Sequence, residues 1–205
     1  MNRILKSLSI ALMLGAVPAA LTIPAQPAMA QAADPAVAQV EGFYDALVAS
    51  MKSGGTAKSR FDKLKPAVEK AFDMPAMTAA AVGPGWAPLS DADKKALTDA
   101  FTRMTVASYA KNFDSYGGEK FPVEPASIAR GSFKYVKSKL VGGETHVFNY
   151  QMHEVGGAWK ITDVLLEGNI SQMAQKRSDF ASTFASGGAQ GLAKRINAIT
   201  DQTLR

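Results

Sequence analysis

Residues 132–168 read SFKYVKSKLVGGETHVFNYQMHEVGGAWKITDVLLEG, and this stretch decides the fold class. Apolar and polar side chains alternate along it with a period of two, which predicts β-strands that have one face buried. Glycine pairs at 142–143 and 156–157 separate the runs, because paired glycines favour the tight turns of β-hairpins. The stretch therefore predicts an antiparallel meander with strands over residues 132–141, 145–154 and 158–167.

On both sides of this meander the apolar spacing changes to the helical period. A short edge strand is expected at 121–124, and Pro66 is expected to break or kink the second of the early helices. The early helices are predicted over residues 35–53, 61–72, 74–82 and 91–113. A glycine pair at 187–188 separates the closing helices, over 170–186 and 189–204. This order of elements predicts one α+β domain.

An apolar cavity between the sheet and the helices is the interpretation that follows from the large apolar side chains. Several of them are methionines, whose flexible side chains suit a deformable ligand. A filled core would show the same periodicity, so the residues alone leave both interpretations open. The candidate lining residues are Phe72, Met74, Met77, Trp86, Phe101, Met104, Phe113, Phe133, Tyr135, Phe148, Tyr150, Met152, Ile161 and Leu165.

Asp163 is a polar residue in the middle of the third predicted strand, between Ile161 and Leu165 on a face that is otherwise apolar. A buried carboxylate is usually hydrogen-bonded to a neighbouring strand or helix, which is the first interpretation. The second is a polar group on the wall of a pocket, where a carboxylate can act as a general base.

Composition and motifs exclude several classes of function. The chain has no cysteine, which excludes thiol catalysis and thiolate metal sites. Its net charge of +5 comes from scattered lysines and arginines, so nucleic-acid binding is not expected. His146 and His153 lie at an odd spacing on one predicted strand, which sends them to opposite faces, so no metal site is expected. Phosphate loops, nucleophile elbows and dinucleotide fingerprints are absent from the sequence, and no cofactor is expected.

Residues 1–30 have the pattern of a secretory signal peptide. Arg3 and Lys6 precede an apolar run from Leu8 to Ala20, and residues 28–30 (AMA) form a small-x-small cleavage site. We therefore expect cleavage before Gln31 and a single mature domain over residues 31–205 in the bacterial periplasm. An uncleaved membrane anchor is the alternative, although the apolar run is short for a bilayer span and prolines interrupt its continuation.

Three segments carry a resemblance to a known family. The first has FDMPAM at 72–77 followed by VGPGW at 82–86, and the second has GAWKITDVLLEG at 157–168. The third has FAS at 180–182, followed by GG at 187–188 and GLA at 191–193. In this order and spacing they resemble the MlaC-like family, also called toluene-tolerance auxiliary proteins of ABC transporters. The resemblance extends over nearly the whole of residues 31–205.

This resemblance implies a monomeric periplasmic lipid carrier with an NTF2-like antiparallel sheet, wrapped by N-terminal and C-terminal helices around a deep apolar pocket. The implied partners are an inner-membrane ABC transporter complex and an outer-membrane lipoprotein complex, between which such a carrier shuttles phospholipid. One branch of the family resembles proteins associated with hopanoids, so a rigid polycyclic lipid is an alternative ligand. Many relatives run Glu-Gly-Ile-Ser after the last strand, whereas this chain inserts Asn169, which leaves the pocket rim and the lipid class open.

Two other functions are considered beside the carrier. An enzyme on the same scaffold would use Asp163 as general base and a tyrosine such as Tyr135 as proton donor. A docking module would present an exposed apolar groove to a protein partner, without an enclosed volume. The carrier is favoured over both chiefly by the family resemblance.

Overall fold

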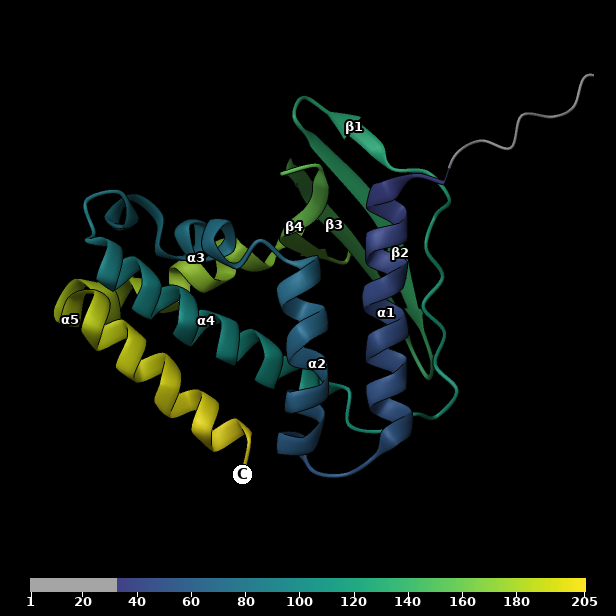
Figure 1. Ribbon diagram of the computed structural model, residues 1–205, viewed down its shortest axis with the longest axis horizontal. Helices are drawn as coiled ribbons and strands as arrows, with labels where there is room; N and C mark the ends of the chain where they lie inside the picture. Colours follow the sequence, from purple (N-terminus) through teal and green to yellow (C-terminus); the bar gives the residue numbers. More distant parts are fainter. Residues whose placement is uncertain (1–32) are drawn as a thin grey trace, which may run out of the picture. The chain divides into compact units, whose positions relative to one another are not determined.

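In the computed structural model, which describes residues 33–205, an antiparallel sheet packs against a set of helices (Figure 1). The strands follow one another across the sheet in chain order. They are β1 (Ile128–Arg130), β2 (Phe133–Val141), β3 (Thr145–Val155), β4 (Ala158–Leu166) and β5 (Ile170–Ser171). The α+β fold class and both glycine hairpins are therefore confirmed, whereas the signal peptide predicted for residues 1–30 lies outside the described residues.

The helices are α1 (Pro35–Ser53), α2 (Ala57–Ala71), α3 (Met74–Val82), the 3-10 turn η1 (Gly83–Trp86), α4 (Asp91–Asn112) and α5 (Gln172–Thr203). All five α-helices begin at a residue whose side chain accepts a hydrogen bond from a backbone N–H of the first turn. The break expected at Pro66 is wrong, since α2 continues through it. Leu64 and Val68 are buried on either side of this proline, and their packing outweighs one lost backbone hydrogen bond.

Several further elements differ from the sequence-based expectation, and β1 was not predicted. The expected strand at 121–124 forms only isolated bridges, of Lys120 with Val141 and of Val123 with Ser138. Ile170 belongs to the short strand β5, so the first closing helix begins two residues later than predicted. The closing helices meet at a kink within α5, where Gly188 has a φ of 60°, a conformation that residues with a Cβ atom rarely adopt.

A β-bulge in β4 changes which side chains face the helices. Tyr150 pairs with Val164, whereas Met152 pairs with Ile161, so β4 has one more residue than β3 in this interval. The extra residue reverses the alternation of faces along β4. Ile161 and Val164 are consequently both buried, whereas Leu165, expected on the same face as Ile161, is only partly buried.

The start of α1 is tied to the sheet by a carboxylate. Asp34 caps α1 and also accepts hydrogen bonds from the backbone N–H and the side chain of Ser127. Lys134 of β2 completes the cluster with an ion pair of 2.9 Å to Asp34 Oδ1. Figure 1 shows α1 running along β2 from this point. Among residues 33–205, no helix has both the length and the apolar character needed to cross a bilayer.

Candidate functional site

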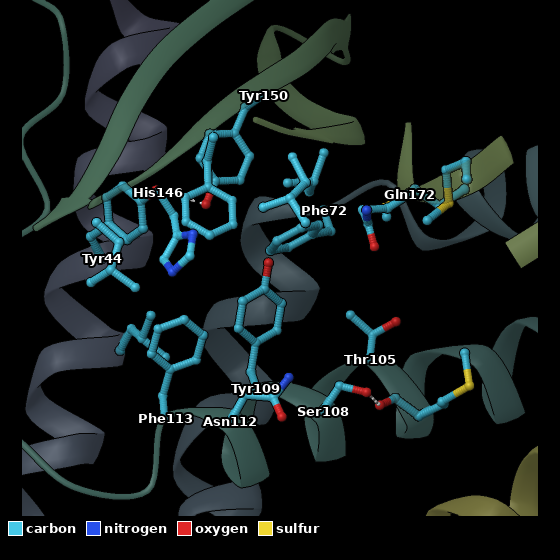
Figure 2. Close-up of a pocket in the computed structure, with 18 of the residues that line it drawn as sticks. Tyr44, Phe72, Thr105, Ser108, Tyr109, Asn112, Phe113, His146, Tyr150 and Gln172 are labelled. Atoms are coloured by element: carbon cyan, nitrogen blue, oxygen red, sulfur yellow. Dashed lines mark hydrogen bonds between the residues drawn. The ribbon is translucent and has the colours of Figure 1, made fainter. Parts of the chain in front are cut away.

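A partly open cavity of about 520 Å³ lies between the sheet and the helices (Figure 2). Its walls come from α1, α4, the first turns of α5 and strands β2 to β4, with Phe72, Met77 and Phe121 completing them. This volume lies within the range of about 300 to 1,000 Å³ that is typical of small-molecule pockets. Of the two interpretations of the apolar pattern, a lined cavity therefore describes this interior better than a fully packed core.

Helix α4 contributes one continuous stripe to the cavity wall. Positions 101, 104, 105, 108, 109 and 112 line it, and this spacing of three and four residues places them on a single helix face. Phe101 and Met104, nearer the start of the stripe, are buried, whereas Ser108 and Asn112 are exposed. The stripe therefore runs from an apolar floor to a polar mouth.

Tyrosines from three elements meet in the inner part of the cavity. Tyr150 donates to the hydroxyl of Tyr44 over 2.8 Å, and Tyr44 Oη lies 2.7 Å from Ser138 Oγ. The hydroxyl of Tyr109 points from α4 towards this group (Figure 2). Burial raises the pKa of Tyr44, Tyr109 and Tyr150, so all three phenols stay neutral at physiological pH. Their rings supply apolar surface while the hydroxyl groups of Tyr44 and Tyr150 satisfy one another.

The mouth of the cavity carries two ionisable side chains that are engaged with neighbours. His146 of β3 lies 3.0 Å from Glu167, through Nδ1 and Oε1. Lys176 of α5 pairs with Asp179 at 3.4 Å. Both pairs are substantially exposed, so each contributes little to stability. Neither carboxylate lines the cavity itself.

The structure brings together half of the predicted lining residues. Those that line the cavity are Phe72, Met77, Phe101, Met104, Phe113, Phe148 and Tyr150. Those that do not are Met74, Trp86, Phe133, Tyr135, Met152, Ile161 and Leu165. Met74, Met152 and Ile161 are buried in the core beside the cavity instead.

For Phe133 and Tyr135 the predicted face is wrong. Tyr135 pairs with Gln151 in the register of β2 and β3, and its hydroxyl donates to Gln151 Oε1 over 2.8 Å. Val136, which pairs with Tyr150, is the fully buried residue of β2. Alternation alone cannot tell which face of a strand meets the helices when both carry apolar groups. Leu165 is displaced from the cavity by the bulge, which brings Val164 and Leu166 to it.

Some lining residues were not predicted. Tyr44 and Leu47 of α1 and Tyr109 of α4 follow the helical apolar spacing, so the sequence contained the signal for them. The polar residues of the mouth did not stand out, because polar positions on a helix usually face solvent. The lining residues absent from the prediction are Tyr44, Leu47, Thr105, Ser108, Tyr109, Asn112, Phe121, Leu140, His146, Val164, Leu166, Gln172, Met173 and Lys176.

Asp163 holds the start of α5 against the sheet. Its Oδ1 accepts hydrogen bonds from the backbone N–H groups of Val164 (2.7 Å) and Met173 (3.1 Å), and its Oδ2 accepts from the Ser171 hydroxyl. The first interpretation of this residue, a carboxylate bonded to a neighbouring helix, is therefore confirmed. Neither Asp163 nor Tyr135 lines the cavity, so the base and donor arrangement considered for an enzyme does not form there.

The two histidines lie apart. His146 lines the cavity, whereas His153 Nε2 lies 2.7 Å from Oδ2 of Asp73, the residue that caps α3. Within residues 33–205, histidine and carboxylate side chains form no group of three or more that could bind a metal ion.

Comparisons with known proteins identify a family model and a solved structure that are similar to this chain. A family model described as "MlaC protein" matches residues 41–198. A solved structure with a similar fold is the phospholipid-binding protein from Ralstonia solanacearum in complex with a phospholipid. That chain is 19% identical, with a TM-score of 0.72, and the alignment covers 84% of this chain and 100% of the other. No curated protein matches this chain.

Proposed function

This chain belongs to the MlaC family, and from that premise we propose that it is a soluble lipid carrier of the bacterial periplasm. In this role it shuttles phospholipid, or a related lipid such as a hopanoid, between the inner and outer membranes as a component of an ABC transport system. The observation that carries the proposal is the partly open cavity, whose floor is apolar and whose mouth is polar.

The apolar floor provides the binding free energy. An acyl chain that leaves water for this floor gains about 0.8 kcal/mol for each buried methylene. Phe72, Phe101 and Tyr150 are each no more than 2% exposed, so their rings offer the chain a surface from which water is largely excluded. Methionines at Met77 and Met104 adjust to chains of different length and unsaturation. The lipid head group stays at the mouth, in contact with solvent.

Phospholipid is the first candidate among the lipids. The similar chain from Ralstonia solanacearum was solved with a phospholipid, and it shares this fold over its whole length. That likeness supports a phospholipid cargo for this chain. A hopanoid is the second candidate, and the flexible methionine side chains of the cavity could also pack against a rigid ring system.

Export places the carrier between the two membranes. Residues 1–30 act as the signal peptide in this proposal, and residues 31–205 form the mature domain. Its partners are an inner-membrane ABC transporter complex and an outer-membrane lipoprotein complex. The carrier works as a monomer, because a diffusing shuttle must present its cavity mouth to each membrane complex in turn.

The proposed role is binding and transfer without a chemical step. The rival enzyme needs Asp163 and Tyr135 on the cavity wall, and hydrogen bonds hold both side chains elsewhere. The docking module would present an exposed groove, whereas this domain contains a partly open cavity between the sheet and the helices. No observation on the described residues favours either rival.

Lipid co-purification tests the carrier function. The full chain is expressed with its leader in a Gram-negative host, and the exported protein is purified without detergent for native mass spectrometry. We expect one bound lipid per protein, identified after organic extraction. Exported, folded protein that carries no stoichiometric lipid, and takes none from vesicles, would contradict the proposal.

A matched pair of variants locates the lipid. Phe148 lines the cavity, whereas Phe133 on the neighbouring strand does not, and both are partly buried. Phe148→Glu places a charge where acyl chains are proposed to lie, so lipid occupancy should fall at least about tenfold. Phe133→Glu serves as the control and should leave occupancy unchanged. Equal occupancy in both folded variants would place the lipid elsewhere.

A further inference from the structure

A second hollow, of about 690 Å³, lies between α1 and the segment that follows α4. We call residues 119–124 of this segment the edge arm, because they run along the second half of β2 at the margin of the sheet (Figure 1). We call the hollow itself the α1 groove. Its other wall is one face of α1, whose residues lie three and four positions apart: Glu41, Tyr44, Asp45, Val48, Ala49 and Lys52.

The edge arm has backbone groups without a partner on its open side. Lys120 and Pro122 are bonded to β2 through their backbone, over distances of 2.8 to 3.0 Å. Because successive residues of a strand direct their backbone groups to opposite sides, those of Phe121 and Val123 face away from β2. Within residues 33–205 these groups form no backbone hydrogen bond. Both residues also line the α1 groove.

The proline of the edge arm leaves this open side intact. Proline often protects a sheet edge, because it lacks the N–H group that a further strand would use. The missing N–H of Pro122 would face β2, so the N–H groups of Phe121 and Val123 are unaffected. An extended segment of another protein can pair with them as an added strand.

The charge of the α1 groove is opposite to that of the chain, which is +5. Carboxylates of Glu41, Asp45 and Glu119 line the groove, and among the described residues none of them lies in an ion pair. The cation of this lining, Lys52, lies 4.6 Å from the centre of the Tyr116 ring. The groove therefore attracts a cationic segment.

We propose that the α1 groove docks an extended segment of a partner protein that carries lysine or arginine. Its backbone pairs with Phe121 and Val123, and its cations lie beside Glu41 and Asp45. Two paired residues make a small interface, and such contacts are transient, as a carrier that must leave each partner requires. This inference adds a partner site to the proposed carrier and does not depend on which lipid is bound.

A second copy of this chain suits the α1 groove less well than a cationic partner. Symmetric pairing of two edge arms would bring the acidic linings of both grooves into one interface, and like charges there oppose association.

Amide hydrogen exchange with a synthetic peptide tests the docking. The probe is an acetylated peptide of alternating lysine and valine, added at millimolar concentration to the exported protein, and exchange is followed by NMR. The N–H groups of Phe121 and Val123 should exchange severalfold more slowly with the peptide, because an added strand gives each an acceptor. The fully N-methylated peptide, which cannot form these bonds, should protect neither. Protection of neither amide by the first peptide, or equal protection by both peptides, would overturn the proposal.

A matched pair of variants tests the backbone contact. Val123→Pro removes one outward N–H, whereas Val123→Ala keeps it and controls for the lost side chain. Peptide affinity should be about fivefold lower in Val123→Pro than in Val123→Ala. Val123 does not line the lipid cavity, so lipid occupancy should stay unchanged in both. Equal affinities would overturn the strand pairing. The N-methylated peptide makes the same comparison on the unaltered protein, so the test does not depend on folding of the proline variant.

Charge variants test the acidic lining. Glu41→Gln combined with Asp45→Asn should weaken peptide binding about threefold or more, and added salt should weaken it further. Glu154→Gln is the control, since Glu154 is exposed and does not line the groove. A peptide with glutamate in place of lysine that bound equally well would overturn the assignment to a cationic partner.

Sedimentation of the free protein distinguishes the partner from a second copy, and we expect a monomer. A dimer that forms in Val123→Ala and not in Val123→Pro would assign the edge arm to a second copy and overturn the proposal. Peptide docking by a protein that loads no lipid would contradict the carrier function and leave the docking site standing.

Discussion

The hydroxyl of Tyr150 in β3 donates a hydrogen bond to the hydroxyl of Tyr44 in α1 over 2.8 Å. The chain of bonds continues to Ser138 of β2, which donates to the carbonyl of Phe148 over 3.1 Å. Helix α1 is thus joined to two strands by polar contacts that surround an apolar cavity. Because these hydroxyls satisfy one another, the inner wall presents ring surfaces to a ligand and few unpaired polar groups.

Removing one hydroxyl from this chain should weaken the fold and spare the cavity. Tyr150→Phe keeps the ring and leaves Tyr44 bonded to Ser138, so we expect the free energy of unfolding to fall by about 1 kcal/mol. Urea unfolding measures this value, and lipid occupancy should stay unchanged. Tyr135→Phe removes the more exposed bond to Gln151 and serves as the control, with a smaller expected loss. A Tyr150→Phe variant as stable as the wild type would contradict this role.

Asp163 should stabilise the fold, and its replacement should also slow the uptake of lipid. Asp163→Ala leaves the backbone N–H groups of Val164 and Met173 without their acceptor, so stability should fall by about 2 to 3 kcal/mol. Asp163→Asn keeps one carbonyl acceptor and should lose less. Lipid uptake from vesicles should slow in the alanine variant, because α5 supplies Met173 and Lys176 to the cavity. The matched control is Asp179→Ala, on the exposed surface of α5, and its stability should be nearly that of the wild type. Equal losses of stability in both alanine variants would contradict the structural role of Asp163.

The cap of α1 predicts a pH dependence of stability. Burial alone would raise the pKa of the Asp34 carboxyl, but hydrogen bonds from Ser127, Lys134 and the first turn of α1 outweigh burial and hold this pKa well below its ordinary value. A carboxylate whose pKa is lower in the folded than in the unfolded chain stabilises the fold at pH values above its unfolded pKa of about 3.9. This stabilisation is lost as the pH falls below about 3.9 towards the folded pKa.

Asp34→Asn tests this linkage by chemical denaturation at a series of pH values. The variant should be less stable than the wild type at neutral pH, and the difference should shrink as the pH falls below about 4. Asp91→Asn, at an exposed residue in the first turn of α4, is the control for removing a carboxylate from a helix start. A difference for Asp34→Asn that stayed constant down to acid pH would show that the pair with Lys134 and the bonds from Ser127 do not depend on the charge.

Arg60 should stabilise the fold by donating hydrogen bonds to backbone carbonyl groups, one of them at the C-terminal end of α4. Its side chain is 5% exposed, and it donates from Nε to the carbonyl of Ala110 over 2.8 Å and from Nη1 to the carbonyl of Gly55 over 2.6 Å. Ala110 lies in the last turn of α4, where carbonyl groups have no partner within the helix. We expect Arg60→Ala to lower the midpoint of thermal unfolding, with a loss of about 2 to 3 kcal/mol. Lys63→Ala, an exposed change in the same helix, should have little effect, and similar melting of both variants would refute the expectation.

Much of the architecture could be predicted because its signals are local. Glycine pairs at 142–143 and 156–157 select hairpin turns whatever surrounds them, and period-two alternation identifies the strands between them. Caps at Asp34, Asp73 and Ser90 define helix starts through bonds within one turn. Pro66 shows the limit of such signals, since burial of Leu64 and Val68 outweighs a local preference.

The candidate site was predicted only in part, because its lining depends on register and on packing between distant segments. No local pattern marks the bulge between Ile161 and Val164, and one extra residue there exchanges Leu165 for Val164 on the inner face. Tyr135 and Val136 are neighbours in β2 with similar strand preference, and only their pairing across to Gln151 and Tyr150 decides which one is buried.

The sequence by itself determined most of the elements, their order and the family, since these depend on short-range spacing and on motifs of a few residues. Tertiary structure alone decided that the interior holds an open volume, and that one face of α4 and the start of α5 line it together. The physical reason is that an apolar side chain gains a similar free energy whether it touches another side chain or a ligand's hydrocarbon. The space left for a ligand is therefore set by where the helices lie over the sheet.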